Sequence, residues 1–370
     1  MRRPLRHGYT TGACAAAAAR GAALMLARRE TVSEVTIDLP AGVSATFELH
    51  GQEFGPDAAA CFVVKDAGDD PDVTDGVEVH ATVTANPSRP SFPKGGGNVV
   101  IEGGTGIGRA TKPGLAVAPG EWAINPVPRQ MITEAVRTIF PAADVRVEIS
   151  IPDGEERAKK TLNARLGIVG GLSILGTSGI VRPISAKAWT DTIDAALDVA
   201  RACGSPTVVL STGRTSEMAA QKLFEVQGSG FEVFNIERLP EEAYIMMGDH
   251  VAHAARACQE RGFDRPVIAC QFAKLLKIAC GHENTHAVAS EMDLSRLRAW
   301  ADAAGLPSPL RALVSRANTA REIALESRFD PALLELVCRR ARDAVQGHAP
   351  GIRAEFLVAD YGGNVVLHWR

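Results

Sequence analysis

The first half of the chain consists of short runs in which apolar and polar residues alternate, which is typical of strands with one buried face. These runs predict strands at residues 34–39, 44–49, 61–65, 77–83, 98–102 and 145–151. Helices are expected from residue 12 or 13 to 29, with Thr11 near the N-cap, and at 130–140 and 155–162. Strands and helices in this mixture predict an α+β N-terminal part.

The second half alternates strands and helices more regularly. The predicted strands are 207–210, 231–235 and 266–270, and the predicted helices are 188–203, 216–226, 241–261 and 273–280. Helices then dominate residues 294–345, and two strands, 354–359 and 364–369, follow. This order predicts a doubly wound, mostly parallel sheet with helices on both faces. The glycine-rich stretch 166–181 separates the halves, so we expect an α/β protein of two domains, residues 1–182 and 183–370.

Composition and charge exclude several classes of protein. Among the 370 residues 46% are apolar, and the net charge is −3, which gives no general attraction to nucleic acid or an anionic membrane. Arg20 and Gly21 interrupt the alanine-rich stretch 13–27, so no apolar run reaches membrane length. The basic first residues are not followed by the leucine-rich core of a signal peptide, and we expect a cytoplasmic protein. Seven cysteines without a Cys-x-x-Cys pair argue against a disulfide scaffold or a zinc ribbon.

The residues Thr10, Thr11 and Gly12 open the alanine-rich helix. Free N–H groups and hydroxyls at a helix start form an anion site, and a cysteine in the first turn, here Cys14, would have a lowered pKa. The alternative is a plain N-cap in front of a closely packed helix.

An acidic loop occupies residues 65–76, where Asp66, Asp69 and Asp70 precede two further aspartates. The EF-hand spacing fails, because a count from Asp70 puts Asp75 in the place of the glycine and Ala81 in that of the bidentate glutamate. The loop is therefore either a solvated turn or a set of carboxylates that act on a ligand.

A predicted strand runs into a loop with four glycines, Gly103, Gly104, Gly106 and Gly108. Such a loop can cradle a nucleotide, but Lys112-Pro113 denies the long helix that an ordinary dinucleotide motif needs. The glycines still predict a close approach of the backbone. Arg109 and Lys112 beside them suit carboxylates or phosphates.

The segment from His282 to His286 reads His-Glu-x-x-His, the signature of zinc peptidases. That chemistry needs both histidines on one helical face, with the glutamate, here Glu283, as general base. Gly281 is expected to end the preceding helix, so the helical context is missing. The paired histidines remain candidate site residues.

A buried strand also leads into Ser211, Thr212, Gly213 and Arg214, which precede a helix. Ligands of open α/β sheets bind at the carboxyl ends of the strands, where these groups can hold a polar or anionic group. The alternative is an ordinary capped turn.

Together these stretches resemble the cobalt-precorrin-5B (C1)-methyltransferase family of cobalamin biosynthesis. The resemblance covers most of the chain and is carried by residues 8–17, 65–76, 102–108, 111–115, 125–129, 151–155, 166–183 and 211–214 and by Gly281, His282, Thr285 and His286. Glu283 is not part of the family pattern, which counts against the peptidase interpretation.

The resemblance implies that a methyl group passes from S-adenosylmethionine to ring carbon C-1 of cobalt-precorrin-5B and gives cobalt-precorrin-6A. Cobalt would arrive with the substrate, and no metal site of the protein is implied. The partners implied are this corrinoid and the methyl donor, with no nucleic acid and no membrane; a homo-oligomer is left open.

Candidate roles follow from the chemistry of residues in and beside these blocks, since no donor motif of the family assigns the donor pocket. The catalytic candidates are Asp66, Asp69, Asp70, His282 and His286. The donor is expected at Ser211, Thr212 and Gly213, facing Gly103, Gly104, Gly106 and Gly108 across a cleft between the domains. The carboxylates of the substrate need local polar and cationic groups, for which the candidates are Thr10, Thr11, Arg109, Lys112, Arg129, Arg182 and Arg214.

Three other functions stay open at this point. A zinc-dependent hydrolase that uses His282, Glu283 and His286 would lose activity in Glu283→Gln. A non-catalytic corrinoid-binding subunit would bind the substrate without binding the donor. Phosphotransfer at the glycine loop would need the Gly-Lys-Ser/Thr sequence, which is absent there.

Overall fold

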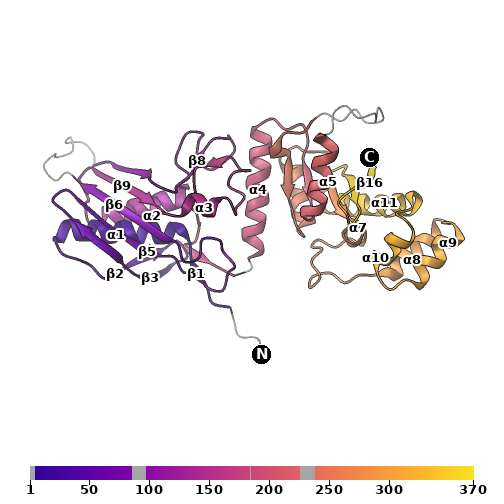
Figure 1. Ribbon diagram of the computed structural model, residues 1–370, viewed down its shortest axis with the longest axis horizontal. Coiled ribbons are helices and arrows are strands. Elements are labelled where there is room, and N and C mark those ends of the chain that lie inside the picture. The colour runs from indigo at the N-terminus through magenta and orange to yellow at the C-terminus, as the bar shows by residue number, and fades with distance from the viewer. Residues whose placement is uncertain (1–4, 86–96, 184, 226–237) are drawn as a thin grey trace. The chain divides into compact units, whose positions relative to one another are not determined.

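The computed structural model describes residues 5–85, 97–183, 185–225 and 238–370 (Figure 1). The predicted strand at 231–235 lies outside these residues. The chain divides into two compact units, Met1–Ser185 and Ala186–Arg370. Within the described ranges, no helix is both long and apolar enough to cross a membrane.

A five-stranded sheet forms the centre of the first unit. Its strands, in spatial order, are β4 (His50–Phe54), β5 (Ala58–Val64), β6 (Glu78–Ala85), β9 (Val145–Ser150) and β7 (Val99–Gly103). Neighbouring strands are antiparallel, except that β7 and β9 run parallel. A separate hairpin is formed by β2 (Glu34–Leu39) and β3 (Val43–Glu48).

Helix α1 (Thr11–Arg28) packs against this sheet through alanines that are almost completely buried. Small side chains allow the helix backbone to lie close to β5. At Gly21 a Cβ atom would lie 2.4 Å from the Cδ1 atom of Leu49 and 3.1 Å from the Sγ atom of Cys61 in β5, so a larger residue would be too close there. Helix α2 (Pro126–Arg137) packs against α1, and the core of the unit is formed by the sheet and these two helices.

Short pairings connect distant parts of the first unit. β1 (Gly8–Tyr9) pairs antiparallel with β11 (Ile180–Val181). β8 (Arg109–Ala110) pairs in the same way with β10 (Ile168–Val169) and brings two glycine-rich loops together. Helix α3 (Gly154–Ala158) follows β9.

The second unit contains the predicted doubly wound sheet. Its strands, in spatial order, are β13 (Tyr244–Met246), β12 (Val209–Ser211), β14 (Val267–Gln271), β15 (Glu355–Ala359) and β16 (Val365–Trp369). The first four run parallel, and β16 is antiparallel to β15. The mixed α/β fold expected from the sequence is thus confirmed.

Helices cover both faces of this sheet (Figure 1). Helix α5 (Arg214–Glu225) packs on one face, where it meets Val209 of β12. The opposite face, which includes Leu210 of β12, packs against four helices. They are α4 (Ala186–Ala202), α6 (Val251–Glu260), α7 (Phe272–Ala279) and α11 (Pro331–His348). Helices α8 (Leu294–Ala303), α9 (Ser308–Arg316) and α10 (Ala320–Glu326) fill the predicted helical region between α7 and α11.

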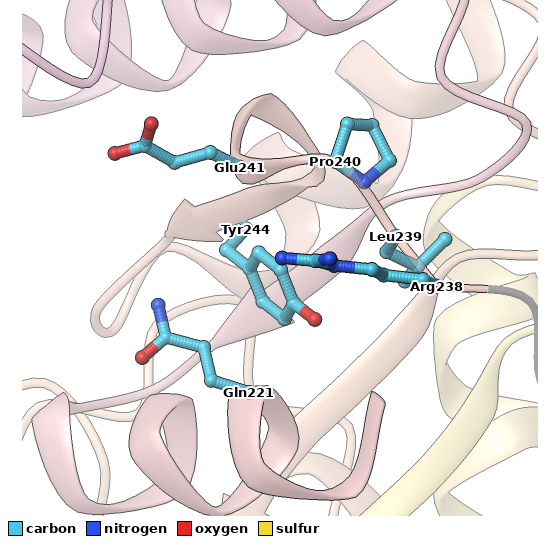
Figure 2. Close-up of a pocket in the computed structure, with 6 residues that line it drawn as sticks. All are labelled: Gln221, Arg238, Leu239, Pro240, Glu241 and Tyr244. Atoms are coloured by element: carbon cyan, nitrogen blue, oxygen red, sulfur yellow. The ribbon is translucent and has the colours of Figure 1, made fainter. Parts of the chain in front are cut away.

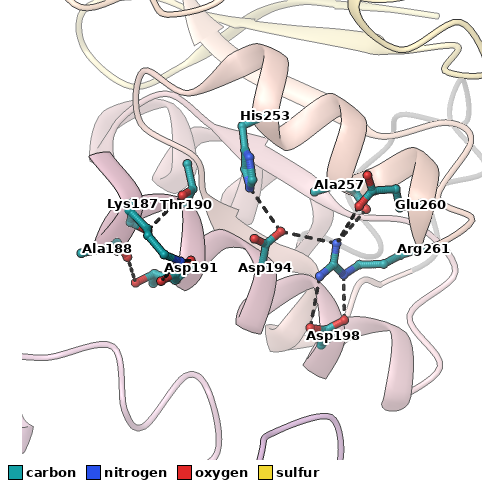
Figure 3. Close-up of polar contacts among 11 residues, drawn as sticks. Lys187, Ala188, Thr190, Asp191, Asp194, Asp198, His253, Ala257, Glu260 and Arg261 are labelled. Carbon is teal, nitrogen blue, oxygen red and sulfur yellow. Dashed lines mark hydrogen bonds and ion pairs between the residues drawn. The ribbon is translucent and has the colours of Figure 1, made fainter. Parts of the chain in front are cut away.

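An ion cluster fixes helix α4 to the end of α6 (Figure 3). The Arg261 guanidinium donates through Nε to Asp198 at 2.7 Å and lies 3.4 Å from Asp194. His253 is also 3.2 Å from Asp194. The hydrogen bond with Asp198 raises the pKa of Arg261, so its charge is retained at every accessible pH. The cluster holds the start of the second unit against its sheet.

One predicted element is wrong. Residues 241–261 form not one helix but a 3-10 turn, η1 (Glu241–Ala243), then β13 and α6. The apolar run from Tyr244 to Met247 enters the sheet as a buried strand, and Gly248, with φ of 58°, turns the chain before the helix starts. Strand β4 was not predicted, because its sequence is mostly polar and its pairing with β5 is irregular.

Candidate functional site

The carboxyl edge of the parallel sheet in the second unit is the main candidate site. After β12 the chain adds β13 on one side of it, and then returns to add β14 on its other side. The direction in which the sheet grows therefore reverses between β12 and β14. Open α/β sheets bind ligands at such a switch point, outside the carboxyl ends of the strands. Ser211 ends β12 and Gln271 ends β14 at this point.

The turn after β12 holds a buried hydroxyl at this switch point. Ser211 is fully buried, and its carbonyl accepts hydrogen bonds from Met247 N at 3.0 Å and Gly248 N at 3.2 Å. Its Oγ atom has no hydrogen-bond partner among the described residues. An unsatisfied buried hydroxyl costs free energy unless a ligand or water completes its bonding. This is the feature of the turn that fits a bound polar group.

The rest of the predicted turn is held by the backbone. Thr212 N donates to Ala269 O at 3.0 Å, which ties the turn to β14. Ser216 Oγ donates to Gly213 O at 2.8 Å. Arg214 begins helix α5 and is exposed.

A second polar group lies after β13. The Oδ1 atom of Asp249 accepts from Thr285 Oγ1 at 2.6 Å and from the Lys274 ammonium. Burial by itself raises the pKa of Asp249, but the hydrogen bonds and charge of Lys274, with Thr285, outweigh it and hold the pKa below its usual value. Asp249 is therefore a carboxylate at neutral pH.

The segment with the two histidines is fastened to this carboxyl edge. Lys277, a buried residue of α7, donates to Thr285 O at 3.1 Å and to Ser290 O at 3.0 Å. The neighbouring Thr285 hydroxyl donates to Asp249, and the Nδ1 atom of His286 accepts from Val288 N at 3.3 Å. The structure thus brings part of the 282–286 segment to the same sheet edge as Ser211.

The geometry of a zinc peptidase is not present in this segment. Helix α7 ends at Ala279 and α8 begins at Leu294, so residues 282–286 are not helical. The two histidines therefore do not share a helical face. Glu283 is exposed and lies 3.7 Å from Arg256. Among the described residues, no cluster of three or more His, Cys, Asp or Glu side chains could hold a metal ion.

The acidic loop of the first unit is bonded within the protein. The Asp66 carboxylate takes two hydrogen bonds from the Arg6 guanidinium, one of them at 2.8 Å, and this contact lowers the pKa of Asp66. Asp69 accepts from Arg6 N at 2.6 Å. The carbonyl of Asp70 accepts from Asp72 N at 2.8 Å.

A buried ion pair below this loop was missed by sequence reasoning. Lys65 is 2% exposed, and its ammonium donates to Asp72 at 2.7 Å. Asp72 also accepts from the Thr74 N–H and hydroxyl at 2.7 Å. The available signal was a lysine that directly follows the apolar run of β5.

The start of helix α1 is a buried cap. Thr10 Oγ1 accepts from Ala13 N at 3.2 Å, and Thr11 Oγ1 accepts from Leu175 N at 3.0 Å. Both threonines are buried. The expected low pKa of Cys14 is wrong: complete burial raises it to about 12, because desolvation of a thiolate outweighs the nearby Lys65 charge.

The four glycines of the glycine loop face the protein's own atoms. A Cβ on Gly103 would lie 2.6 Å from Trp122, and one on Gly104 would lie 2.8 Å from Glu148. Gly106, with φ of 72°, approaches the Ile151 carbonyl, and Gly108 approaches the Gly171 carbonyl. Packing within the unit therefore accounts for these glycines, and their role toward a donor stays a prediction.

The predicted cationic side chains differ in how many contacts they make within the protein. Arg129 donates to three carbonyls, those of Ile124 at 2.8 Å, Ile101 at 3.2 Å and Trp122 at 3.4 Å. Arg109 lies 3.7 Å over the Trp122 ring and donates to Gly120 O. A longer contact of 3.5 Å joins Lys112 Nζ to Arg165 O. Arg182, like Arg214, is exposed.

A cavity of about 320 Å³ lies elsewhere in the second unit, beside the start of β13 (Figure 2). It is lined by Gln221, Arg238, Leu239, Pro240, Glu241 and Tyr244, none of which was predicted as a site residue. Tyr244 is the first residue of β13, so the cavity is at the end of the strand remote from Ser211. It adjoins residue 238, where the described chain resumes, and we assign no ligand to it.

The fold defines a protein with two α/β units, one of which presents a candidate ligand site at the carboxyl edge of a doubly wound sheet. Two family models match the sequence: CbiD over residues 1–183 and the CbiD C-terminal domain over residues 284–370. The chain belongs to the CbiD family. Residues 184–283, which contain Ser211 and Asp249, lie between these two matches.

Relatives extend the likeness over the whole chain. It is 65% identical to the cobalt-precorrin-5B C(1)-methyltransferase of Pelobacter propionicus, across 98% of this chain and 96% of that protein. It is 58% identical to the protein of the same name from Geobacter metallireducens, across 98% of both. A crystal structure of the cobalamin biosynthesis protein (cbiD) from Archaeoglobus fulgidus is 28% identical, covers 73% of this chain and 78% of that chain, and has a TM-score of 0.38. The family expected from the sequence motifs is confirmed.

Proposed function

We propose that this protein is a methyltransferase that moves a methyl group from S-adenosylmethionine to ring carbon C-1 of cobalt-precorrin-5B, giving cobalt-precorrin-6A. The observation that carries the reaction is the full-length identity of 65% to a protein named for it. Cobalt enters as part of the substrate. The reaction would take place in the cytoplasm, where the substrate's biosynthesis is expected.

Methyl transfer depends more on the positions of donor and acceptor than on a strong acid or base. The sulfur–methyl bond breaks with its electron pair retained by sulfur, and the new carbon–carbon bond forms with an electron pair from the macrocycle. Such an in-line displacement gains most from holding donor and acceptor at near-attack distance. A strong acid–base pair is therefore not required of the site residues.

We place the donor at the carboxyl edge of the second unit. The buried Ser211 hydroxyl, which has no partner among the described residues, supports this placement because a polar ligand at the switch point would complete its hydrogen bonding. Thr212 and Gly213 form the turn that would pass beside the ligand. In the first unit, the candidates for catalysis stay Asp66, Asp69 and Asp70. The glycine loop stays a candidate for contact with the donor.

The substrate carries acetate and propionate groups, so the protein must supply cations to it. Arg182 and Arg214 suit this role because their side chains are exposed. Arg129 suits it less, since its guanidinium is already bonded to three carbonyls. His282 and His286 would contact the macrocycle or move a proton, as neutral imidazoles can.

An anaerobic single-turnover assay tests the reaction. The full chain is mixed with labelled S-adenosylmethionine and cobalt-precorrin-5B, and the corrinoid is followed by mass spectrometry. Gain of one labelled methyl group per corrinoid, located at C-1 by NMR, is the expected result. Glu283→Gln is the matched control and should leave this rate unchanged. Binding of the corrinoid without donor binding or transfer would instead favour a non-catalytic corrinoid-binding subunit.

A further inference from the structure

An exposed tryptophan lies over the chain that follows β13. Trp189, on helix α4, is 48% exposed, yet its indole Nε1 donates to the Met247 carbonyl at 3.2 Å. A Cβ atom on Gly248 would come within 3.0 Å of the indole Cζ2 atom. The glycine therefore lets the ring lie directly on the backbone at the carboxyl edge of the sheet.

The ring is fixed in place while much of its surface stays open. The imidazole of His250 supports it, with ring centroids 6.4 Å apart and planes 26° apart. A large apolar ring that is half exposed and yet hydrogen-bonded and supported on one side is preorganised to stack on a flat ligand.

The residue directly before His250 is Asp249, whose carboxylate has one bonded and one open oxygen. Lys274 and Thr285 both donate to the Oδ1 atom of Asp249. The Oδ2 atom has no hydrogen-bond partner among the residues that the structure describes, and the side chain is 23% exposed. Asp249 thus keeps one open acceptor, and it stands in the chain between Gly248 and His250, which both lie against the indole.

The same turn is bonded to the Ser211 strand end. Met247 and Gly248 both contact the indole, and their N–H groups both donate to Ser211 O. The aromatic ring, the open carboxylate oxygen and the buried hydroxyl are therefore joined by adjacent backbone at a single sheet edge.

We propose that Trp189 and Asp249 form a nucleoside subsite, in which the indole stacks on the base and the Asp249 Oδ2 atom accepts hydrogen bonds from the ribose hydroxyls. The inference rests on the proposed function, because it assigns this subsite to the adenosine part of the methyl donor. An open carboxylate oxygen favours a ligand with hydroxyl donors over a macrocycle that carries many carboxylates, because like charges repel at short range.

Calorimetry with S-adenosylhomocysteine tests the stacking. Trp189→Ala in the full chain should raise the Kd for this probe by about fivefold to 150-fold, the range that alanine substitution of a base-stacking aromatic produces. Trp189→Phe should restore most of the affinity. Leu325→Ala is the matched control, because Leu325 is 49% exposed on a helix of the same unit. Thermal unfolding checks that each variant is folded.

The outcomes separate this subsite from the proposed function. If the wild-type protein binds S-adenosylhomocysteine and Trp189→Ala binds it equally well, the subsite is wrong while the proposed function stands. If the variant loses affinity for a cobalt corrinoid but not for S-adenosylhomocysteine, the ring serves the macrocycle and the subsite is again wrong. If the wild-type protein neither binds the probe nor transfers methyl, both proposals fail.

Asp249→Asn tests the ribose contact. The measurement is a ratio of two affinities, which a purely structural role of Asp249 would leave unchanged. The wild-type protein should bind S-adenosylhomocysteine about tenfold more tightly than its 2′,3′-dideoxy analogue, since the analogue lacks the hydroxyls that donate to the charged Asp249 oxygen. In Asp249→Asn this ratio should fall toward one, whereas the Leu325→Ala control should keep it. A ratio that is unchanged in Asp249→Asn would overturn the ribose contact, even if the variant were less stable.

Discussion

The acidic loop of the first unit and the sheet edge of the second unit differ in how their polar groups are used. In the loop, Arg6 pairs with Asp66, and Lys65 pairs with Asp72. At the sheet edge, Ser211 Oγ and one oxygen of Asp249 have no hydrogen-bond partner among the described residues. The comparison teaches that a conspicuous motif can be internal structure, while a polar group without an internal partner at a strand end is a candidate for a ligand contact.

The largest expected effect tests the internal role of the loop. Asp72→Ala should lower the free energy of unfolding by about 3 kcal/mol, because it leaves the buried Lys65 ammonium without its counter-charge. Urea unfolding of the full chain measures this change. Asp69→Ala, which removes one exposed contact, should have a much smaller effect, and equal effects in the two variants would contradict the comparison.

The same pair gives a pH dependence. Burial raises the pKa of Asp72, but the hydrogen bond and charge of Lys65, with the bonds from Thr74, lower it further than burial raises it. A carboxyl whose folded pKa is lowered contributes stability above its unfolded pKa, about 3.9, and loses it as the pH falls through the folded value. Unfolding of Asp72→Ala should therefore depend less on pH below about 4.

A somewhat smaller effect is expected at a predicted substrate residue. Arg129→Met should lower the free energy of unfolding by about 2 kcal/mol, because three carbonyls lose a charged donor. Arg146→Met is the control, since Arg146 is exposed and, within the described part of the chain, pairs with Glu102 alone. If Arg129→Met kept wild-type stability but no longer bound the corrinoid, the prediction would be wrong and Arg129 would be a substrate-binding residue.

The smallest effect on stability is expected at the sheet edge. Ser211→Ala should change the free energy of unfolding by less than about 1 kcal/mol, because the hydroxyl has no internal bond to lose among the described residues. Its affinity for S-adenosylhomocysteine should nevertheless fall by about tenfold, the loss of one hydrogen bond to a buried group. Titration calorimetry and urea unfolding measure the two quantities separately. A large loss of stability would show that the hydroxyl serves the fold.

The sequence predicted most elements of the fold, because alternation and helical spacing are local. Residues 34–39 form strand β2 as expected, and α1 differs from the prediction by about one residue at each end. The failure at 241–261 has a tertiary cause. Good helix-forming residues, Glu241 to Ala243, precede the run from Tyr244 to Met247, and its place beside β12 makes that run a strand.

The residues of the candidate site could be predicted only in part, for the same reason. Ser211 to Arg214 could be found because a strand, a polar turn and a helix follow each other directly in the sequence. Trp189 and Asp249 could not, because the indole reaches the β13 turn only through the packing of α4 on the sheet. The pairing of Lys65 with Asp72 was hidden, because five neighbouring aspartates were equal candidates for any cation.

The pairing of β1 with β11 has a consequence for synthesis on the ribosome. Gly8 pairs with Val181, so β1 at the start of the first unit can form its pairing only after β11, near the end of that unit, has been synthesised. Closing so long a loop is entropically unfavourable until the intervening sheet has formed. The emerging chain can therefore assemble the hairpin and the central strands early, but Gly8–Tyr9 is secured only after residues 180–181 have left the exit tunnel. Translation thus sets the order in which this unit is completed.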